Sequence, residues 1–256
     1  MNDVPGPAAA PPAPAIQVCD AAIGFGGRLL FSALSMQAPG GMTTCLLGPS
    51  GVGKSSLLRL IAGLLAGTGT VTADDGKPLS GRIAWMGQQD LLLPWASVLE
   101  NVTLGVTLRG GRVGATERAR AMALLNNVGL GDRAGDRPDA LSGGMRQRAA
   151  LARTLFEDRP IVLMDEPFSA LDAITRLDMQ DLAARLLCDR TVIMVTHDPM
   201  EALRLGHQVL VLTGSPARLS TPLTPAGDTP RPPDQHALLT QQGELLSRLR
   251  GGETAV

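Results

Sequence analysis

Apolar residues along this chain form short runs that alternate with segments in which they recur at helical spacing. The short runs predict buried strands at Met42–Leu47, Arg82–Met86, Ile161–Met164, Thr191–Thr196 and Gln208–Thr213. Helices are predicted between them, at Ser55–Leu65, Thr116–Val128, Gly144–Phe156 and Ala173–Leu187. Strands that alternate with helices predict an α/β fold with a mostly parallel sheet that is covered on both faces.

Two stretches depart from this alternation. Residues 16–36 and 67–81 combine short apolar runs with glycines, which predicts strands joined by turns and an antiparallel β edge. Between residues 91 and 141 the clearest helix candidate is Thr116–Val128, and three glycines and Pro138 follow it. We interpret the region of about 91–144 as an α-helical subdomain inserted into the α/β core.

The two ends of the chain differ in composition from the middle. Residues 1–15 are rich in Pro and Ala and lack the basic and apolar segments of a secretion signal, so we expect a disordered tail. After residue 214 the chain is rich in Pro and Thr until a short helix predicted at His236–Leu249. The expected organisation is a tail (1–15), one α/β domain (16–214) and a C-terminal tail with a short helix (215–256).

Composition narrows the classes of function. The net charge of -1 does not provide the basic surface that is typical of nucleic-acid binding. The aromatic content is only 2%, without Tyr, so side chains that could stack on bases are few. No apolar run approaches the roughly 18 residues of a membrane-spanning helix. Cys19, Cys45 and Cys188 are too widely spaced for a metal cluster. We therefore expect a cytoplasmic protein with free thiols and no nucleic-acid partner.

A glycine-rich loop follows the first buried strand. The segment Gly48-Pro49-Ser50-Gly51-Val52-Gly53-Lys54-Ser55, continued by Ser56, matches G-x-x-x-x-G-K-[ST]. Glycines let the backbone turn sharply and direct its N–H groups at phosphate oxygens, and the helix that follows adds the positive end of its dipole. We expect Lys54 to reach the β- and γ-phosphates of a nucleotide and Ser55 to ligate Mg²⁺.

An acidic pair ends a later strand. Ile161–Met164 is fully apolar, and Asp165 and Glu166 follow it at the carboxyl end. Two carboxylates could simply cap a strand, but the phosphate loop upstream favours a catalytic interpretation. Asp165 is then placed to hold Mg²⁺, and Glu166 to polarise the attacking water as a general base.

Two further residues are candidates for the same site. Gln88 lies in a polar turn, where its amide could contact Mg²⁺ or the attacking water, and Gln89 is an equal candidate from spacing alone. His197 follows the strand Thr191–Thr196, at the edge of the sheet where ligands bind in open α/β folds. There it could hydrogen-bond the γ-phosphate and orient Glu166.

The sequence predicts a second anion-binding segment at Leu141-Ser142-Gly143-Gly144, just before a predicted helix. Ser142 is a plausible N-cap, and exposed N–H groups at such a helix start also bind phosphate. Because the chain's own phosphate loop already holds a nucleotide, we expect this segment to bind the nucleotide of a second subunit arranged head to tail.

These motifs, in this order, resemble those of the ABC ATPase family over about residues 16–213. The resemblance implies a P-loop NTPase (RecA-like) core that binds and hydrolyses ATP with Mg²⁺. It selects Gln88 over Gln89 and identifies His197 as the family's switch histidine. It also places Asp172, in Ser169–Asp172, near the shared nucleotide, and Phe25 where the family often has a Tyr stacked on adenine.

A finer resemblance concerns residues 92–102. Leu92-Leu93-Pro94-Trp95 and Val98-Leu99-Glu100-Asn101-Val102 are similar to the ATPases of nitrate, sulfonate and taurine importers, and to those of importers for pyrimidine precursors of thiamine. In that group this region contacts the permease. The resemblance implies a homodimer on the cytoplasmic face of the inner membrane, working with a permease and a periplasmic or extracellular solute-binding protein.

Two alternatives stay open at this point, an ABC exporter subunit and a non-transport ABC ATPase. Pro94-Trp95 disfavours the exporter. The short distance between Lys54 and Asp165 leaves no room for the long coiled coils of structural-maintenance relatives. A GTPase acting alone should carry an NKxD motif, which is missing. The solute is not encoded in this chain, because the ATPase never contacts it.

Overall fold

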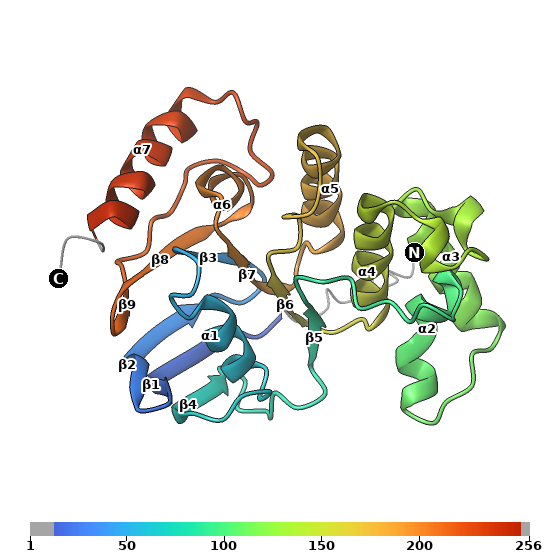
Figure 1. Ribbon diagram of the computed structural model, residues 1–256, viewed down its shortest axis with the longest axis horizontal. Coiled ribbons are helices and arrows are strands. Elements are labelled where there is room, and N and C mark those ends of the chain that lie inside the picture. Colours follow the sequence, from blue (N-terminus) through green and yellow to red (C-terminus); the bar gives the residue numbers. More distant parts are fainter. Residues whose placement is uncertain (1–12, 252–256) are drawn as a thin grey trace, which may run out of the picture.

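Strands from both halves of the chain join in one sheet in the computed structural model, which describes residues 13–251 (Figure 1). Within these residues the sheet has nine strands in the order β4-β1-β2-β9-β8-β3-β7-β6-β5. The strands are β1 (Ile16–Phe25), β2 (Arg28–Ala38), β3 (Thr43–Leu47), β4 (Thr68–Ala73), β5 (Ile83–Met86), β6 (Ile161–Asp165), β7 (Thr191–Thr196), β8 (Gln208–Gly214) and β9 (Ala217–Leu219).

Seven α-helices lie within the described residues. They are α1 (Lys54–Ile61), α2 (Val98–Leu108), α3 (Ala115–Asn127), α4 (Gly143–Phe156), α5 (Ala173–Leu186), α6 (Pro199–Leu205) and α7 (His236–Gly251). Two short 3-10 helices, Gly131–Arg133 and Pro138–Ala140, lead into α4. The mixed α/β fold predicted from the sequence is confirmed.

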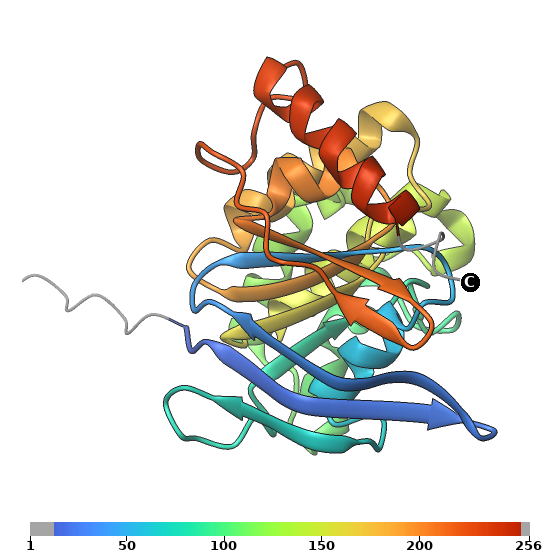
Figure 2. The same cartoon turned by 90° about the vertical axis from the view of Figure 1, so that its left-hand side faces the viewer.

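The centre of the sheet is parallel, and its edge is antiparallel. Strands β8, β3, β7, β6 and β5 pair in parallel, so their carboxyl ends meet at one edge. Strand β1 pairs antiparallel with both β2 and β4. Figure 2 shows these three strands stacked at one margin of the molecule, on the opposite side from α7. The antiparallel edge expected from residues 16–36 and 67–81 is therefore present.

Apolar residues fill both faces of the parallel strands, which explains their continuous apolar runs. One face packs against α1 and the antiparallel strands, through residues such as Leu46, Leu58 and Ile193. The other face packs against α4, α5, α6 and α7, through residues such as Met164 and Leu245. Alternate residues of one strand thus point into different cores.

Helices α2, α3 and α4 form a separate apolar cluster. Val102 of α2, Leu125 of α3 and Phe156 of α4 are each at most 1% exposed within it. Helix α4 also contributes Leu151 to the core beneath the sheet, so it belongs to both. Figure 1 shows α2 and α3 at one end of the molecule, away from β1, β2 and β4. The helical region thus continues through α4 to Phe156, beyond residue 144.

Two helices were not predicted, and one ends earlier than expected. Ser97 and Glu100 form a capping box at the start of α2, a signal that the sequence does contain. The seven-residue α6 is too short for a clear apolar period, although Asp198 and Pro199 are typical of a helix start. Helix α1 ends at Ile61 rather than at Leu65, and Gly63 behind it takes a positive φ of 69°.

The folded part of the chain begins before residue 16. Residues 1–12 of the expected N-terminal tail lie outside the described residues. Ala13 and Ala15 are buried, and the Thr191 hydroxyl donates to the carbonyl of Pro14 at 2.7 Å, so residues 13–15 belong to the folded part. Across residues 13–251, every helix is too short or too polar to cross a membrane.

Candidate active site

The glycine-rich loop connects β3 to α1 at the carboxyl edge of the sheet. Gly51 has a φ of 80° and Gly53 a φ of 114°, conformations that favour glycine. A Cβ on Gly48 would lie 2.4 Å from the carbonyl oxygen of Leu212, so this strand end also requires glycine. The loop therefore places the amino end of α1 at the mouth of the site, where its dipole favours an anion.

Lys54 is the first residue of α1, and its side chain folds back over the loop. Its ammonium donates to the carbonyls of Gly48 and Pro49, at 2.7 and 2.9 Å. Burial lowers the pKa of Lys54, and the carboxylates of Glu166 and Asp165 oppose this effect. A cation thus lies beside the loop whose shape is typical of phosphate binding.

Ser55 and Asp165 bring two oxygen ligands together from distant parts of the chain. The Ser55 hydroxyl donates to Oδ1 of Asp165 at 2.8 Å. Burial raises the pKa of Asp165, and the hydrogen bond from Ser55 opposes the rise. A hydroxyl and a carboxylate are ligands that suit Mg²⁺, which takes few protein ligands and completes its shell with waters and phosphate oxygens. The residues present therefore fit this ion.

Glu166 follows β6, and its side chain contacts Gln88, which lies after β5, and His197, which follows β7. Its Oε2 lies 3.4 Å from the amide nitrogen of Gln88 and 3.2 Å from Nδ1 of His197. Its backbone has a φ of 47°, a left-handed conformation that costs a non-glycine residue about 1–3 kcal/mol and is concentrated at functional sites. The carboxylate predicted as the base is thus oriented by two polar side chains.

A cavity of about 520 Å³ opens above these groups. Its lining consists of Phe25, Leu30, Ser50, Gly51, Gly53, Lys54, Ser55, Ser56, Gln88 and Glu166. From the sequence, all of these residues except Leu30 were candidates for the site. Leu30 was missed because an apolar residue in a strand is expected to lie in the core, and no local motif distinguishes it. Phe25 is 55% exposed at the end of β1, which leaves its ring face open.

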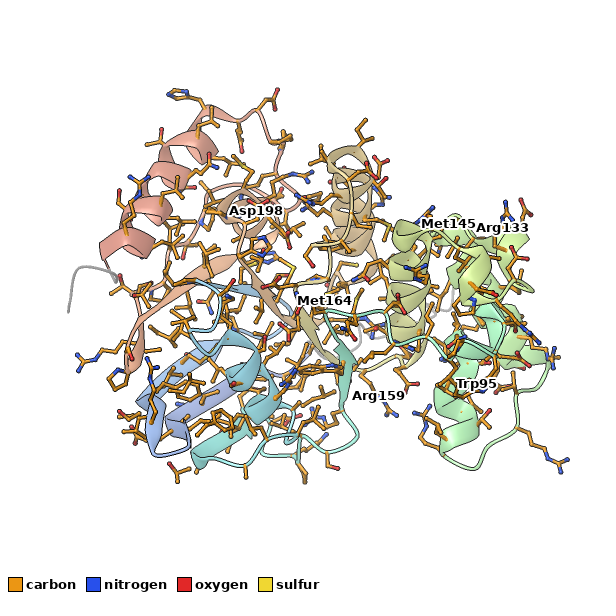
Figure 3. All side chains as sticks on the ribbon, in the orientation of Figure 1. Trp95, Arg133, Met145, Arg159, Met164 and Asp198 are labelled. Carbon is orange, nitrogen blue, oxygen red and sulfur yellow. The ribbon has the colours of Figure 1, made fainter. Side chains whose placement is uncertain are left out.

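Ser142–Gly144 and Asp172 lie outside the lining of this cavity. The Ser142 hydroxyl accepts from the N–H of Met145 at 3.3 Å, and the Asp172 carboxylate accepts from the N–H of Thr175 at 3.0 Å. Each therefore caps a helix of its own chain. A Cβ on Gly144 would lie 3.4 Å from Leu171, so the two segments are neighbours. Figure 3 shows Met145 at the start of α4.

The fold and the phosphate loop define a P-loop NTPase core. A family model described as ABC transporter matches residues 31–169. The chain belongs to the ABC transporter family and has the fold of its ATPase cassettes.

Curated relatives cover most of the chain. An uncharacterized ABC transporter ATP-binding protein of Haemophilus influenzae is 44% identical over 93% of this chain and 99% of its own length. The aliphatic sulfonates import ATP-binding protein SsuB 1 of Mesorhizobium japonicum is 40% identical over 89% of this chain and 85% of its own. SsuB 1 of Rhodococcus jostii is 52% identical over 65% of this chain and 66% of its own.

Solved structures agree with this family. The dimeric bacterial ABC transporter cassette MJ0796 superimposes with a TM-score of 0.72 at 29% identity, covering 83% of this chain and all of that one. A second MJ0796 dimer, in a post-hydrolysis state bound to ADP and Pi, gives a TM-score of 0.71. The ABC ATPase fold predicted from the motifs is confirmed.

Proposed function

We propose that the chain is the ATP-hydrolysing subunit of an ABC importer for a small solute of the sulfonate, nitrate or taurine kind. The single observation that carries the hydrolytic part is the convergence of Gln88 and His197 on Glu166, at the rim of a cavity built on the phosphate loop. The import function is supported by the SsuB relatives.

The cavity accounts for nucleotide binding. The N–H groups of Gly48–Gly53 and the start of α1 receive the phosphates, with Ser56 extending the helix start. Lys54 exchanges its bonds to Gly48 and Pro49 for the β- and γ-phosphates. The exposed ring of Phe25 and the side chain of Leu30 offer apolar surface for the adenine base.

Ser55, Asp165 and Gln88 would hold Mg²⁺. When bound, this ion neutralises charge on the phosphate oxygens. Glu166 polarises the attacking water and accepts its proton, and His197 fixes the carboxylate and faces the γ-phosphate. Catalysis then consists of positioning and charge stabilisation, without a covalent intermediate.

Ser142, Gly143 and Gly144, with Asp172 beside them, would close over the nucleotide of a second copy. Ser142 and Gly143 are exposed at the start of α4, outside the chain's own cavity. The MJ0796 structures are dimers, which supports the pairing of two copies. Two such copies would sandwich two ATP molecules, and the closed state gains phosphate contacts that the open state lacks.

Residues 92–102 would contact the permease at the cytoplasmic face of the inner membrane. Trp95 is 69% exposed beside α2 (Figure 3), and it borders a cavity of about 650 Å³ together with Ser97 and Leu99. An exposed aromatic at a hollow rim is typical of a protein interface. In this scheme a periplasmic or extracellular solute-binding protein delivers the solute to the permease.

Replacing Glu166 by Gln tests the hydrolytic proposal. The amide keeps the size and the hydrogen bonds of the side chain but cannot accept the proton, so phosphate release at saturating ATP should fall by about 10²–10⁴-fold. Binding of ATP, measured by equilibrium dialysis, should stay within about twofold. Undiminished phosphate release would refute the role of Glu166.

A further inference from the structure

Helix α4 holds the loop that carries Glu166. Gln147 is 4% exposed, and its side-chain amide donates to the carbonyl of Pro167 at 2.5 Å. Pro167 directly follows Glu166 in the chain. A buried amide that reaches out of its own helix to a loop carbonyl fixes the distance between them, because breaking the bond leaves both groups without water.

The same helix also holds the loop that carries Gln88. Nε of Arg146 lies 3.1 Å from Oδ2 of Asp90. Arg153 donates to the carbonyl of Asp90 at 2.5 Å and to that of Leu91 at 2.8 Å. Residues seven positions apart share one helix face, so both arginines reach the same loop.

The backbone at Glu166 depends on such anchors. Its N–H donates to the carbonyl of Val195 at 2.9 Å, and its own carbonyl accepts from the Ser169 hydroxyl at 3.0 Å. Gln147 adds an anchor on the next peptide, from a different element. A left-handed conformation at a non-glycine residue persists only where the surroundings hold it, so each anchor contributes to the position of the carboxylate.

We propose that Gln147, Arg146 and Arg153, here called the α4 tether, are positioning residues that couple the start of α4 to Glu166 and Gln88 of the same chain. This proposal rests on the proposed function, in which Ser142–Gly144 binds the nucleotide of a neighbouring copy. Helix α4 packs in both apolar cores, so a shift at its start moves the tether as one body.

The tether has a consequence for the two sites of a dimer. ATP in the neighbour's site presses on the start of α4, and the tether passes this displacement to the catalytic groups of the first site. Each site is then competent only when the other is filled, which makes hydrolysis cooperative in ATP.

Gln147→Met in the full chain removes the donor and keeps the length of the side chain. We expect kcat for ATP hydrolysis to fall about ten- to a hundredfold, because a small misplacement of a catalytic group has effects of this size. The half-saturating ATP concentration should change by less than about twofold, and the Hill coefficient should fall to about 1. A folded Gln147→Met protein with wild-type kcat and Hill coefficient would overturn the proposal.

Thr154→Val is the matched control on the same helix. Thr154 is 3% exposed, and its hydroxyl donates to the carbonyl of Ala150 within α4 at 2.9 Å. The control should keep the kcat and Hill coefficient of the wild type. An equal loss in Thr154→Val would assign the effect to packing of the helix and would contradict the tether.

Arg146→Gln tests the tether without a fully buried substitution, since this side chain is 37% exposed. The chain has two tryptophans, so a Trp85→Phe background leaves Trp95 as the fluorescent reporter of the segment after Asp90. We expect the ATP-induced change in Trp95 fluorescence to fall to less than about half. The control Arg133→Gln, at an exposed arginine paired with Asp136, should leave it unchanged. A full response in Arg146→Gln would contradict the coupling.

The wild-type protein separates this proposal from the one on which it rests. If the wild-type protein hydrolyses no ATP, both the proposed function and the proposed role of the α4 tether are wrong. If the wild-type protein hydrolyses ATP cooperatively and the Gln147→Met protein is equally active and cooperative, only the proposed role of the α4 tether is wrong.

Discussion

Glu201 shows how burial sets the chemistry of a single side chain. It lies on α6, 5% exposed, and its Oε1 has no hydrogen-bond partner within residues 13–251. Burial raises its pKa to about 8, the charge of Asp198 adds to the rise, and Arg176 opposes it. A carboxyl that stays neutral near pH 7 needs no ion partner, so its burial costs less free energy than the burial of a carboxylate would.

Glu201 should make stability depend on pH. The unfolded chain releases this proton near pH 4.5 and the folded chain near 8, so the folded state holds more protons between these values. Its stability should therefore fall as pH rises through this window, with no further loss above it. Glu201→Gln removes the titration, so urea unfolding between about pH 6 and about pH 8 should show a smaller loss than in wild type.

The control for Glu201 is an exposed glutamate. Glu244 of α7 is 51% exposed and pairs with Arg248, so Glu244→Gln should keep the pH dependence of the wild type. Parallel stability curves for the wild type and Glu201→Gln would show that Glu201 does not carry this proton.

Four helices within the described residues begin at a residue whose side chain caps the first turn. Ser97 caps α2, Ser142 caps α4, Asp172 caps α5 and Asp198 caps α6, each by accepting from a backbone N–H of the first turn. Capping accounts for a Ser or Asp at each of these positions without any ligand. The proposed contact of Ser142 with a neighbour's nucleotide therefore needs a test that keeps capping and binding apart.

Ser97→Ala measures the capping effect alone. Ser97 accepts from the N–H of Glu100, whose carboxylate accepts from the N–H of Ser97 at 2.7 Å. Loss of the cap should lower the free energy of unfolding by about 1 kcal/mol, measured by urea denaturation. Ser97→Asp keeps an acceptor and should stay close to wild type. If Ser97→Ala and Ser97→Asp lower the free energy of unfolding equally, the loss comes from other contacts of the serine and not from capping.

The molecule as a whole has its proposed working surfaces far apart. The nucleotide cavity lies on the sheet, between the antiparallel edge and β6. The proposed permease surface around Trp95 lies beside α2, at the end of the molecule that holds the helical cluster (Figure 3). Helix α4 packs in both cores and so connects the parts of the molecule that carry these surfaces.

Ser142→Arg tests assembly. Its bulk and charge would enter the shared site, so ATP-dependent pairing, followed by light scattering in a Glu166→Gln background, should be lost while the monomer still binds ATP. Ser97→Arg removes a comparable helix cap outside the proposed dimer contact and should pair normally. Normal pairing by the Ser142→Arg protein would contradict the head-to-tail arrangement.

Local sequence patterns determined much of this protein. The central strands, the phosphate loop and the acidic strand end depend on interactions within a few residues, so spacing and residue type were sufficient to predict them. The apolar runs likewise predicted a parallel sheet buried on both faces. Helix α2 was missed although its capping box is local, because its apolar residues do not form a clear single stripe.

Only the tertiary structure decided which distant residues meet. Ser55 and Asp165 are 110 positions apart, and Gln88 and Glu166 are 78 apart, yet the strand order brings each pair to one edge of the sheet. Leu30 joins the cavity, and Gln147 reaches Pro167, for the same reason. Such contacts depend on how elements pack rather than on what any one segment prefers, and no local pattern encodes them.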